Sequence, residues 1–296
     1  MYARLGSSSS SANIMALSFP SMFSLENRTA VVTGGTRGIG AAMSIALAEA
    51  GADIILVQRD ASNTSTKLAI ESLGRKATIY TADLASQAEV SSVAPKILAD
   101  GHDVSILVTC AGIQRRHPSH EFPQADWDEV LQVNLTSVFT LCRDFGAYML
   151  TRTPRSANIT DASDSNRSPA HMHPQSPPHR GSIINVASLV SFQGGLTVPA
   201  YASAKGGIAQ LTKALSNEWA RHGINVNAIA PGYVNTEMNE ALINNQTRAR
   251  QILERIPAGR WGEPDDFKGP VVWLASRASG YVNGEIVVVD GGWMGR

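Results

Sequence analysis

The sequence predicts an α/β fold in which helices cover both faces of a doubly wound parallel sheet, built as a single domain. Short and almost continuously apolar runs recur along the chain, as a parallel sheet covered on both faces requires. Amphipathic, alanine-rich stretches of helical period lie between them, and this alternation is typical of a parallel sheet. With 296 residues, of which 43% are hydrophobic, the chain can bury the core of such a domain.

Seven strands are expected. The runs that predict them are, in chain order, TAVVT from residue 29, DIILV from 53, ATIYTA from 77, VSILVT from 104, SIINVA from 182, INVNAIA from 224 and EIVVVD from 285. The first two helices are expected over 39–50 and 62–73, where Gly51 and Gly74 would end them. Glycine ends a helix because it enters the left-handed conformation at little cost.

Two segments depart from this alternation. Residues 1–24 are serine-rich, and we expect a disordered tail ahead of a domain that spans 25–296; an organelle transit peptide is the alternative for this segment. Residues 151–181 are rich in Ser, Pro, His and Asn, which predicts a disordered surface loop inserted into the domain. The loop contains His171, His173 and His179 without a carboxylate or thiolate framework, so no metal site is predicted.

Composition excludes several function classes. The formal net charge is zero, which gives no electrostatic basis for binding nucleic acid or an anionic membrane. No apolar run approaches the roughly 20 residues that span a bilayer. The two cysteines, Cys110 and Cys142, have no metal-ligand spacing and lie in apolar segments, where a disulfide is not expected. A reducing, cytoplasmic location and function in a pocket are therefore predicted.

A glycine-rich turn follows the first expected strand and opens the first helix, in the segment VVTGGTRGIGAAM. Gly34, Gly38 and Gly40 let the backbone turn tightly and approach a phosphate without an intervening Cβ. The free amides of the helix N-terminus then face the negative charge. This context predicts a dinucleotide site at the turn.

The end of the second strand bears on which dinucleotide binds. A carboxylate there would bind the ribose hydroxyls, whereas a cation accommodates a 2′-phosphate. The sequence has Gln58 at this position, followed by Arg59, with Arg37 in the glycine turn nearby. Two guanidinium groups favour NADP(H). NAD(H) is the alternative, in which both arginines are ordinary surface cations and Asp60 turns back to the ribose.

Tyr201 and Lys205 stand four residues apart in TVPAYASAKGG, on one face of the expected helix. A phenol has a pKa of about 10, so making it a base near pH 7 requires about 4 kcal/mol of differential stabilisation. An ammonium group one turn away could supply much of this in a water-poor site beside a cofactor's positive charge. We therefore expect Lys205 to lower the pKa of Tyr201. The same spacing also occurs by chance on many helices.

Six motifs in order decide between these alternatives, and through them the chain resembles the short-chain dehydrogenase/reductase family over 25–296, apart from 151–181. The motifs are TGGTRGIG from residue 33, CAG from 110, VNL from 133, NVAS from 185, YASAK from 201 and APG from 230. The resemblance implies a Rossmann-like seven-stranded sheet, hydride transfer with NAD(P)(H) and a homotetramer. It implies Asn134, Ser188, Tyr201 and Lys205 as the catalytic set, with Asn134 holding a water that relays protons from Lys205.

The same resemblance implies the residues that contact the cofactor. They are Gly34, Thr36, Arg37, Gly38, Ile39, Gly40, Arg59, Asp83, Leu84, Ala111, Gly112, Tyr201, Lys205, Pro231, Gly232, Val234 and Thr236. The chain departs from the family in one place, because Thr109 and Cys110 replace two asparagines before Ala111 and Gly112. Those asparagines brace the central strands, and Cys110 is interpreted as a packed thiol.

Within the family, the segments from residues 111, 191 and 255 resemble the branch that oxidises sugar acids, the 2-keto-3-deoxygluconate and gluconate 5-dehydrogenases. Arg115 and Arg116 follow the fourth strand, where a guanidinium could bind a substrate carboxylate, and Gln193 is a further candidate. Alternatively, the two arginines serve a subunit interface. Reduction of a neutral ketone, polyol or biosynthetic carbonyl is the alternative activity, and non-enzymatic nucleotide binding is the remote one.

Overall fold

The computed structural model describes residues 19–153 and 179–296. The expected tail and the expected inserted loop therefore lie largely outside the described residues. Their described edges are ordered further than predicted. Residues Pro20–Phe23 form a 3-10 helix, η1, while Thr151 still belongs to a helix and Gly181 begins a strand. Leu25 and Met149, which lie next to these edges, are both fully buried.

The seven predicted strands form one parallel sheet, as the alternation predicted. Its strand order is β3-β2-β1-β4-β5-β6-β7, with the chain crossing over between β3 and β4. Every ladder is parallel. The strands are β1 (Thr29–Thr33), β2 (Asp53–Gln58), β3 (Ala77–Thr81), β4 (Val104–Thr109), β5 (Gly181–Val186), β6 (Ile224–Pro231) and β7 (Ile286–Val289).

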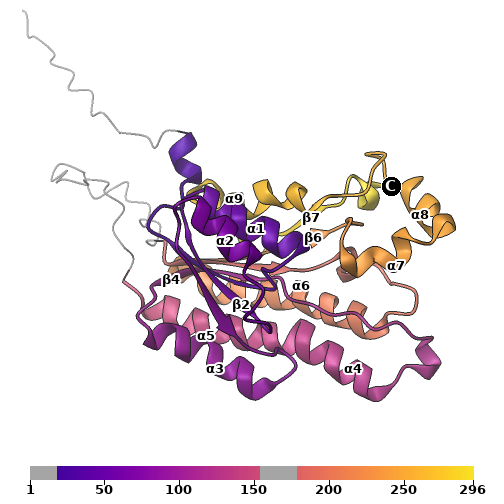
Figure 1. Ribbon diagram of the computed structural model, residues 1–296, viewed down its shortest axis with the longest axis horizontal. Helices are drawn as coiled ribbons and strands as arrows, with labels where there is room; N and C mark the ends of the chain where they lie inside the picture. The colour runs from indigo at the N-terminus through magenta and orange to yellow at the C-terminus, as the bar shows by residue number, and fades with distance from the viewer. Residues whose placement is uncertain (1–18, 154–178) are drawn as a thin grey trace, which may run out of the picture.

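Helices cover both faces of this sheet (Figure 1). Gly51 and Gly74, predicted to end the first two helices, have φ of 108° and 77°, which is the left-handed region expected of them. The α-helices are α1 (Gly38–Glu49), α2 (Ser65–Ser72), α3 (Gln87–Ala99), α4 (Gln124–Leu131), α5 (Ser137–Thr151), α6 (Pro199–Trp219), α7 (Glu240–Ile243), α8 (Gln246–Leu253) and α9 (Lys268–Ala275).

Two hydrophobic cores follow from the alternation of side chains along the strands. On one face, Val31 and Leu107 pack with residues of α3, α5 and α6, such as Phe145. On the other, Val32 and Ile106 pack with residues of α1, α2 and α9. All six residues of β4 and all eight of β6 are buried, as expected of strands covered on both faces.

The central strands are braced by polar side chains where the chain departs from the family pattern. Thr109 Oγ1 donates to Asn185 Oδ1 at 2.8 Å, and Asn185 Nδ2 donates to Thr212 Oγ1 at 3.0 Å. Burial raises the pKa of Cys110 to about 11, which agrees with its interpretation as a packed thiol. Thr109 therefore supplies a cross-strand hydrogen bond in place of an asparagine.

The strands all point the same way, so their carboxyl ends share one edge of the sheet. The short helices α7 and α8, orange in Figure 1, lie beyond that edge. Ligands of open α/β sheets bind at this edge. No helix within 19–153 or 179–296 is both long and apolar enough to cross a membrane.

Candidate active site

A cavity of about 1280 Å³ opens at the carboxyl edge of the sheet. Its wall runs from the glycine turn after β1 to Trp293 near the end of the chain. Every residue that the sequence predicted for the site lines this cavity, with the single exception of Asn134. Segments more than 250 residues apart in sequence, such as Gly34 and Trp293, therefore meet around one site.

The glycine turn has the shape that a phosphate requires. Gly34 and Gly38 have φ of 68° and 52°, which L residues rarely adopt. A Cβ on Gly34 would lie 2.7 Å from Ala111 Cα, and one on Gly40 would lie 2.1 Å from the Gly34 carbonyl oxygen. Substitution at either position would displace backbone, because no side chain there can give way. The turn thus leaves the first amides of α1 open toward the cavity, which fits the pyrophosphate of a dinucleotide.

Three residues at the end of β2 bear on whether NADP(H) or NAD(H) binds, and the structure gives each of them different surroundings. Gln58 is buried and holds its own loop, since Nε2 donates to the carbonyls of Asp60 at 2.6 Å and Asn63 at 2.9 Å. Asp60 lies outside the cavity wall, and its Oδ1 accepts from the Ser62 amide and hydroxyl. Arg59 lines the cavity and is exposed. This geometry speaks against Asp60 as the ribose ligand.

Arg37 reaches across the cavity from the N-cap of α1. Its Nη1 forms an ion pair with Glu237 Oε2, at the start of the segment that leads to α7. Both side chains are exposed, so the pair contributes little to stability. Of the two arginines predicted to bind a 2′-phosphate, Arg59 is thus free of any acidic partner in the described chain, while Arg37 would have to leave Glu237.

Tyr201 and Lys205 lie one turn apart on α6, as predicted. The Lys205 ammonium is 5.6 Å from the centroid of the Tyr201 ring, and its Nζ donates to the Val186 carbonyl at 2.6 Å. Lys205 is only 3% exposed, and burial lowers its pKa to about 8. The ammonium therefore approaches the face of the phenol ring and is held by the end of β5.

The expected lowering of the Tyr201 pKa by Lys205 beside a bound cofactor stays a prediction, and in the protein alone the pKa moves the other way. Burial raises the pKa of Tyr201 to about 12, and this outweighs the lowering by a hydrogen bond to the Ser188 side chain and by the charge of Arg116. Desolvation disfavours the phenolate. The spacing placed the two side chains correctly, but the chain by itself holds the phenol in its protonated form near pH 7.

Ser188 follows β5 and caps the short 3-10 helix η5 (Leu189–Ser191). Its Oγ accepts from the Val190 amide at 3.4 Å, and its amide donates to Ser191 Oγ at 3.2 Å. Ser191 Oγ in turn donates to the Lys205 carbonyl at 2.7 Å, which joins η5 to α6. This local network holds the Ser188 hydroxyl beside the Tyr201 hydroxyl.

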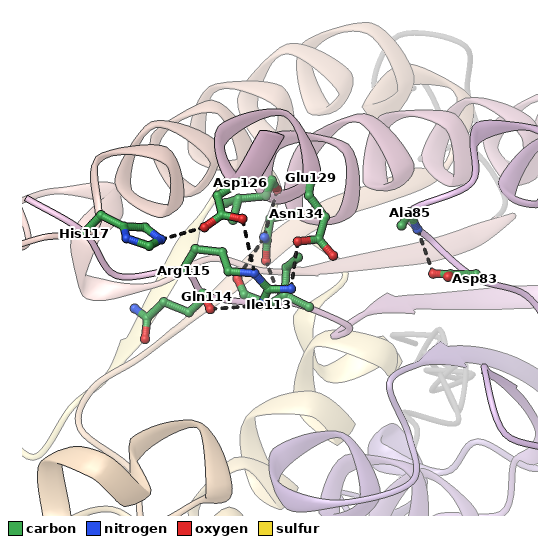
Figure 2. Close-up of polar contacts among 10 residues, drawn as sticks. Asp83, Ala85, Ile113, Gln114, Arg115, His117, Asp126, Glu129 and Asn134 are labelled. Carbon is green, nitrogen blue, oxygen red and sulfur yellow. Dashed lines mark hydrogen bonds and ion pairs between the residues drawn. The ribbon is translucent and has the colours of Figure 1, made fainter. Parts of the chain in front are cut away.

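Asn134 lies in a π-helical turn, Gln132–Thr136, between α4 and α5, and is fully buried behind the cavity wall. Its Oδ1 accepts from the Ile113 amide at 3.1 Å, while Nδ2 donates to the carbonyls of Ile113 at 3.0 Å and Val130 at 2.9 Å (Figure 2). The side chain therefore fixes the segment that follows β4. Its predicted part in a proton relay stays a prediction.

The two arginines predicted to bind a substrate carboxylate have different surroundings. Arg115 Nη2 pairs with Glu129 Oε2 at 2.7 Å, and its Nε lies 3.9 Å from Asp126 Oδ1, both acids of α4 (Figure 2). Arg116 Nη2 instead donates to the neutral Gln114 side chain at 2.6 Å. The structure thus disfavours Arg115 as a carboxylate ligand, because its charge is already neutralised, and leaves Arg116 available. Gln193 lines the same cavity.

Sequence inspection missed several residues of the substrate end. Tyr233, Arg248, Arg255 and Trp293 all line the cavity, and Tyr233 and Trp293 pack edge to face with ring centroids 4.7 Å apart. Arg255 lies over the Trp293 ring, 4.1 Å from its centroid. The aromatic residues directly after APG and GG were the available signal. The two arginines of α8 and the segment after it carried none, because nothing in their spacing shows which face meets the cavity.

The described part of the chain contains no candidate metal site. Within 19–153 and 179–296, no group of three or more histidine, cysteine or acidic side chains could hold a metal ion. His171 and His173 lie outside these residues. His179 does not behave as a solvated loop residue, since burial and the charges of Arg28, Arg277 and Arg152 lower its pKa to about 3.

Two family profiles match the chain. One, short chain dehydrogenase, covers residues 28–169, and the other, enoyl-(acyl carrier protein) reductase, covers residues 167–294. Over 276 residues, the chain is 45% identical to 2-dehydro-3-deoxy-D-gluconate 5-dehydrogenase of Pseudoalteromonas atlantica, and the similarity spans 93% of this chain and 98% of that enzyme. The chain belongs to the short-chain dehydrogenase family. The family membership predicted from the six motifs is thus confirmed.

Further relatives of this short-chain dehydrogenase are similar over nearly their whole length. Gluconate 5-dehydrogenase of Gluconobacter oxydans is 35% identical, over 93% of this chain and 98% of that one. The crystal structure of a gluconate 5-dehydrogenase from Burkholderia cenocepacia, in complex with NADP and tartrate, has a TM-score of 0.81 at 34% identity. The similarity covers 94% of this chain and 99% of that one.

Proposed function

We propose that this short-chain dehydrogenase uses NADP(H) to interconvert a secondary hydroxyl and a ketone on a sugar acid of the gluconate or 2-dehydro-3-deoxygluconate class. One observation carries the proposal: a single cavity joins the glycine turn, the Tyr201 hydroxyl and the Arg116 guanidinium. Relatives named as dehydrogenases of these sugar acids, at 35% and 45% identity, support it. The tartrate bound by a relative of 34% identity supports a site for a hydroxylated carboxylate.

The residues around the glycine turn fit a dinucleotide phosphate. The close approach of Gly34 to Ala111 and of Gly40 to Gly34 keeps the turn free of side chains. Arg59 offers a guanidinium for a 2′-phosphate, and no carboxylate of β2 lines the cavity to prefer a ribose hydroxyl. NADP(H) is therefore the proposed cofactor, and NAD(H) is expected to bind more weakly.

Proton transfer belongs to Tyr201. In the oxidation of an alcohol, its phenolate oxygen takes the hydroxyl proton, while Ser188 Oγ hydrogen-bonds the same substrate oxygen. A dinucleotide held at the glycine turn would supply the hydride acceptor and, as NADP⁺, a positive charge that favours the phenolate. Lowering the pKa of Tyr201 from about 12 to near 7 requires about 7 kcal/mol of differential stabilisation of the phenolate.

In the reverse direction, the protonated phenol donates its proton to the ketone oxygen as hydride arrives at carbon. The raised pKa of Tyr201 keeps this acid protonated near pH 7. Oxidation is therefore expected to accelerate as pH rises from about 7 toward 9, whereas reduction is expected to lack this acceleration.

The absorbance of reduced nicotinamide tests the proposal directly. Purified protein would be given NADP⁺ or NAD⁺ with gluconate, with 2-dehydro-3-deoxygluconate, and with neutral polyols. We expect turnover of a sugar acid with preference for NADP⁺. Tyr201→Phe should lower this rate by about 10²- to 10⁴-fold while binding of NADPH is kept.

Other outcomes would identify a different function. Turnover of neutral polyols or ketones alone would refute the sugar-acid proposal and leave the role of Tyr201 standing. Binding of NADPH without turnover of any alcohol or ketone would favour a non-enzymatic nucleotide-binding protein.

We further propose a homotetramer in the cytoplasm. Cys110 and Cys142 are both free thiols, which suits a reducing compartment. Phe139 on α5 is 44% exposed and stacks with Arg143, with its centroid 5.8 Å from the guanidinium carbon, on a face that another subunit could cover. A solution mass four times that of the chain would support this assembly, and a monomer would refute it.

A further inference from the structure

Five arginines in addition to Arg59 line the cavity, and their guanidinium groups have different interaction partners. Three are already engaged: Arg37 with Glu237, Arg115 with Glu129, and Arg255 over the Trp293 ring. The remaining two are Arg116 and Arg248.

Arg116 and Arg248 each donate to a neutral amide. Arg116 Nη2 donates to Gln114 Oε1 at 2.6 Å, and Arg248 Nη1 donates to Gln251 Oε1 at 3.2 Å. Within 19–153 and 179–296, neither guanidinium has an ion pair with an acid. A guanidinium has five N–H donors, so each keeps most of its donors free for a ligand.

The two guanidinium groups come from two separate elements that line the same cavity. Arg116 belongs to the segment after β4, and Arg248 belongs to α8, whose first turn is capped by Asn245 Oδ1 accepting from the Arg248 amide at 3.1 Å. Partial burial lowers the pKa of Arg116, the Tyr233 and Tyr201 hydroxyls raise it, and the charge of Arg248 lowers it again. Arg116, Arg248 and the catalytic Tyr201 all line the one cavity.

Two unneutralised like charges facing one cavity repel each other, and an anion between them removes that cost. The planar fork of a guanidinium matches the two oxygens of a carboxylate. Arg116 and Arg248 thus offer unused guanidinium donors on the wall of the cavity that Tyr201 also lines.

We propose that Arg248 determines substrate specificity by binding the substrate carboxylate together with Arg116, with Arg115 excluded from this role by its ion pair with Glu129. This inference rests on the proposed function, since it names the group that selects sugar acids over neutral polyols. The inference also assigns a role in substrate binding to α8, because this helix lines the cavity with Arg248, Gln251 and Ile252.

Arg248→Gln tests the inference, with Arg250→Gln as the matched control. Arg250 stands two residues further on the same helix, is exposed, lies outside the cavity wall and faces Glu254 at 3.8 Å. Tartrate binding would be measured by calorimetry on the NADP⁺-loaded protein, and the KM for the sugar acid and for NADP⁺ by turnover. We expect Arg248→Gln to weaken tartrate binding and to raise the sugar-acid KM about 10- to 100-fold, with kcat and the NADP⁺ KM nearly unchanged.

Arg250→Gln should match the wild type in every measurement, and Arg248→Lys should recover part of the affinity that the glutamine loses. Tartrate affinity equal in Arg248→Gln and wild type would overturn the inference, whether or not sugar acids are turned over. Loss of tartrate affinity in Arg248→Gln, in a protein that turns over only neutral substrates, would refute the proposed function and uphold the carboxylate site.

Discussion

At the scale of single residues, the site is dominated by the burial of charge. Lys205 is almost fully buried, its ammonium donates to the Val186 carbonyl, and its pKa falls to about 8. The pKa of Tyr201 moves in the opposite direction, to about 12. Both shifts favour the neutral form, so the protein alone resists the charges that catalysis uses. Binding of the cofactor must therefore supply part of the electrostatic stabilisation.

Lys205→Met is expected to make the unliganded protein more stable. The folded chain binds the lysine proton more weakly than the unfolded chain, so stability rises as pH increases from about 8 to 10.5. Below pH 8 the buried charge costs about 3 kcal/mol, and the hydrogen bond to Val186 returns about 1. The variant should gain about 2 kcal/mol near pH 7 in urea unfolding and lose that gain by pH 10.5.

Lys213, exposed on the same helix, provides the control for that experiment. Lys213→Met should leave the free energy of unfolding nearly unchanged at both pH values. A gain for Lys205→Met that is the same at about pH 7 and pH 10.5 would contradict the buried charge as its cause.

The residues themselves were largely accessible from sequence, and their states were not. Motif order located Ser188, Tyr201 and Lys205, and the structure brings them to one cavity. The direction of the Tyr201 shift depends on desolvation, which is a property of the packed site. The difference between Arg115 and Arg116 depends on Glu129, an acid in the following helix whose facing no local pattern reveals.

At the scale of elements, the π-helical turn between α4 and α5 positions residues 113–116, the segment after β4 that lines the cavity. The turn buries the Asn134 side chain against the segment after β4, where it makes two hydrogen bonds to Ile113 and one to Val130. Turns of this kind are frequent at functional sites. The sequence marked Asn134 but not the turn, because Gln132–Thr136 contains no residue type that distinguishes a π-helical turn from an α-helical one.

Asn134→Ala is expected to destabilise the fold and to make residues 113–116 less firmly held. Loss of the side chain leaves buried groups of Ile113 and Val130 without partners, which costs about 2 to 4 kcal/mol in urea unfolding. Because Arg116 lies three residues after Ile113, the KM for the sugar acid should rise as well. Thr136→Ala, an exposed position in the same turn, should change neither quantity. An unchanged free energy of unfolding in Asn134→Ala would show that these hydrogen bonds do not stabilise residues 113–116.

At the scale of the whole molecule, the two edges of the sheet have different roles. The carboxyl edge holds the cavity. Near the amino edge, Arg28, just before β1, donates to the Ser105 and Ala275 carbonyls, and Arg152 pairs with Asp103. His179 lies among these groups, with Ser182 Oγ 3.2 Å from its Nε2, and its pKa is lowered to about 3. This edge contains mostly positive charge, which together with burial keeps His179 neutral.

His179→Gln is expected to make the protein more tolerant of acid. The folded-state pKa lies below the unfolded value of about 6.5, so the unfolded chain binds the extra proton as pH falls from 6.5 to 3. Stability is therefore lost across that window. The variant should gain about 2 kcal/mol over the wild type between about pH 6.5 and pH 4, allowing for the partial exposure of His179. Denaturant unfolding at a series of pH values measures this gain.

His222→Gln is the comparison, because His222 is exposed and lies in the short 3-10 helix η6 (Ala220–His222) after α6. It should follow the wild type at every pH. If His179→Gln loses stability with acid as steeply as the wild type, protonation of His179 does not contribute to acid unfolding.

The strand order also determines how the chain must fold. Thr29 pairs with Val104, and Ile106 pairs with Ser182, so the two central ladders join strands more than 70 residues apart in sequence. Loop-closure entropy is lost before such contacts form, and folding is correspondingly slow. Strands β4 and β6 are fully buried in the folded protein, but they are exposed until these contacts form. During that time they can associate with the same strands of other molecules. Production of this protein therefore favours slow synthesis at low temperature over refolding from aggregates.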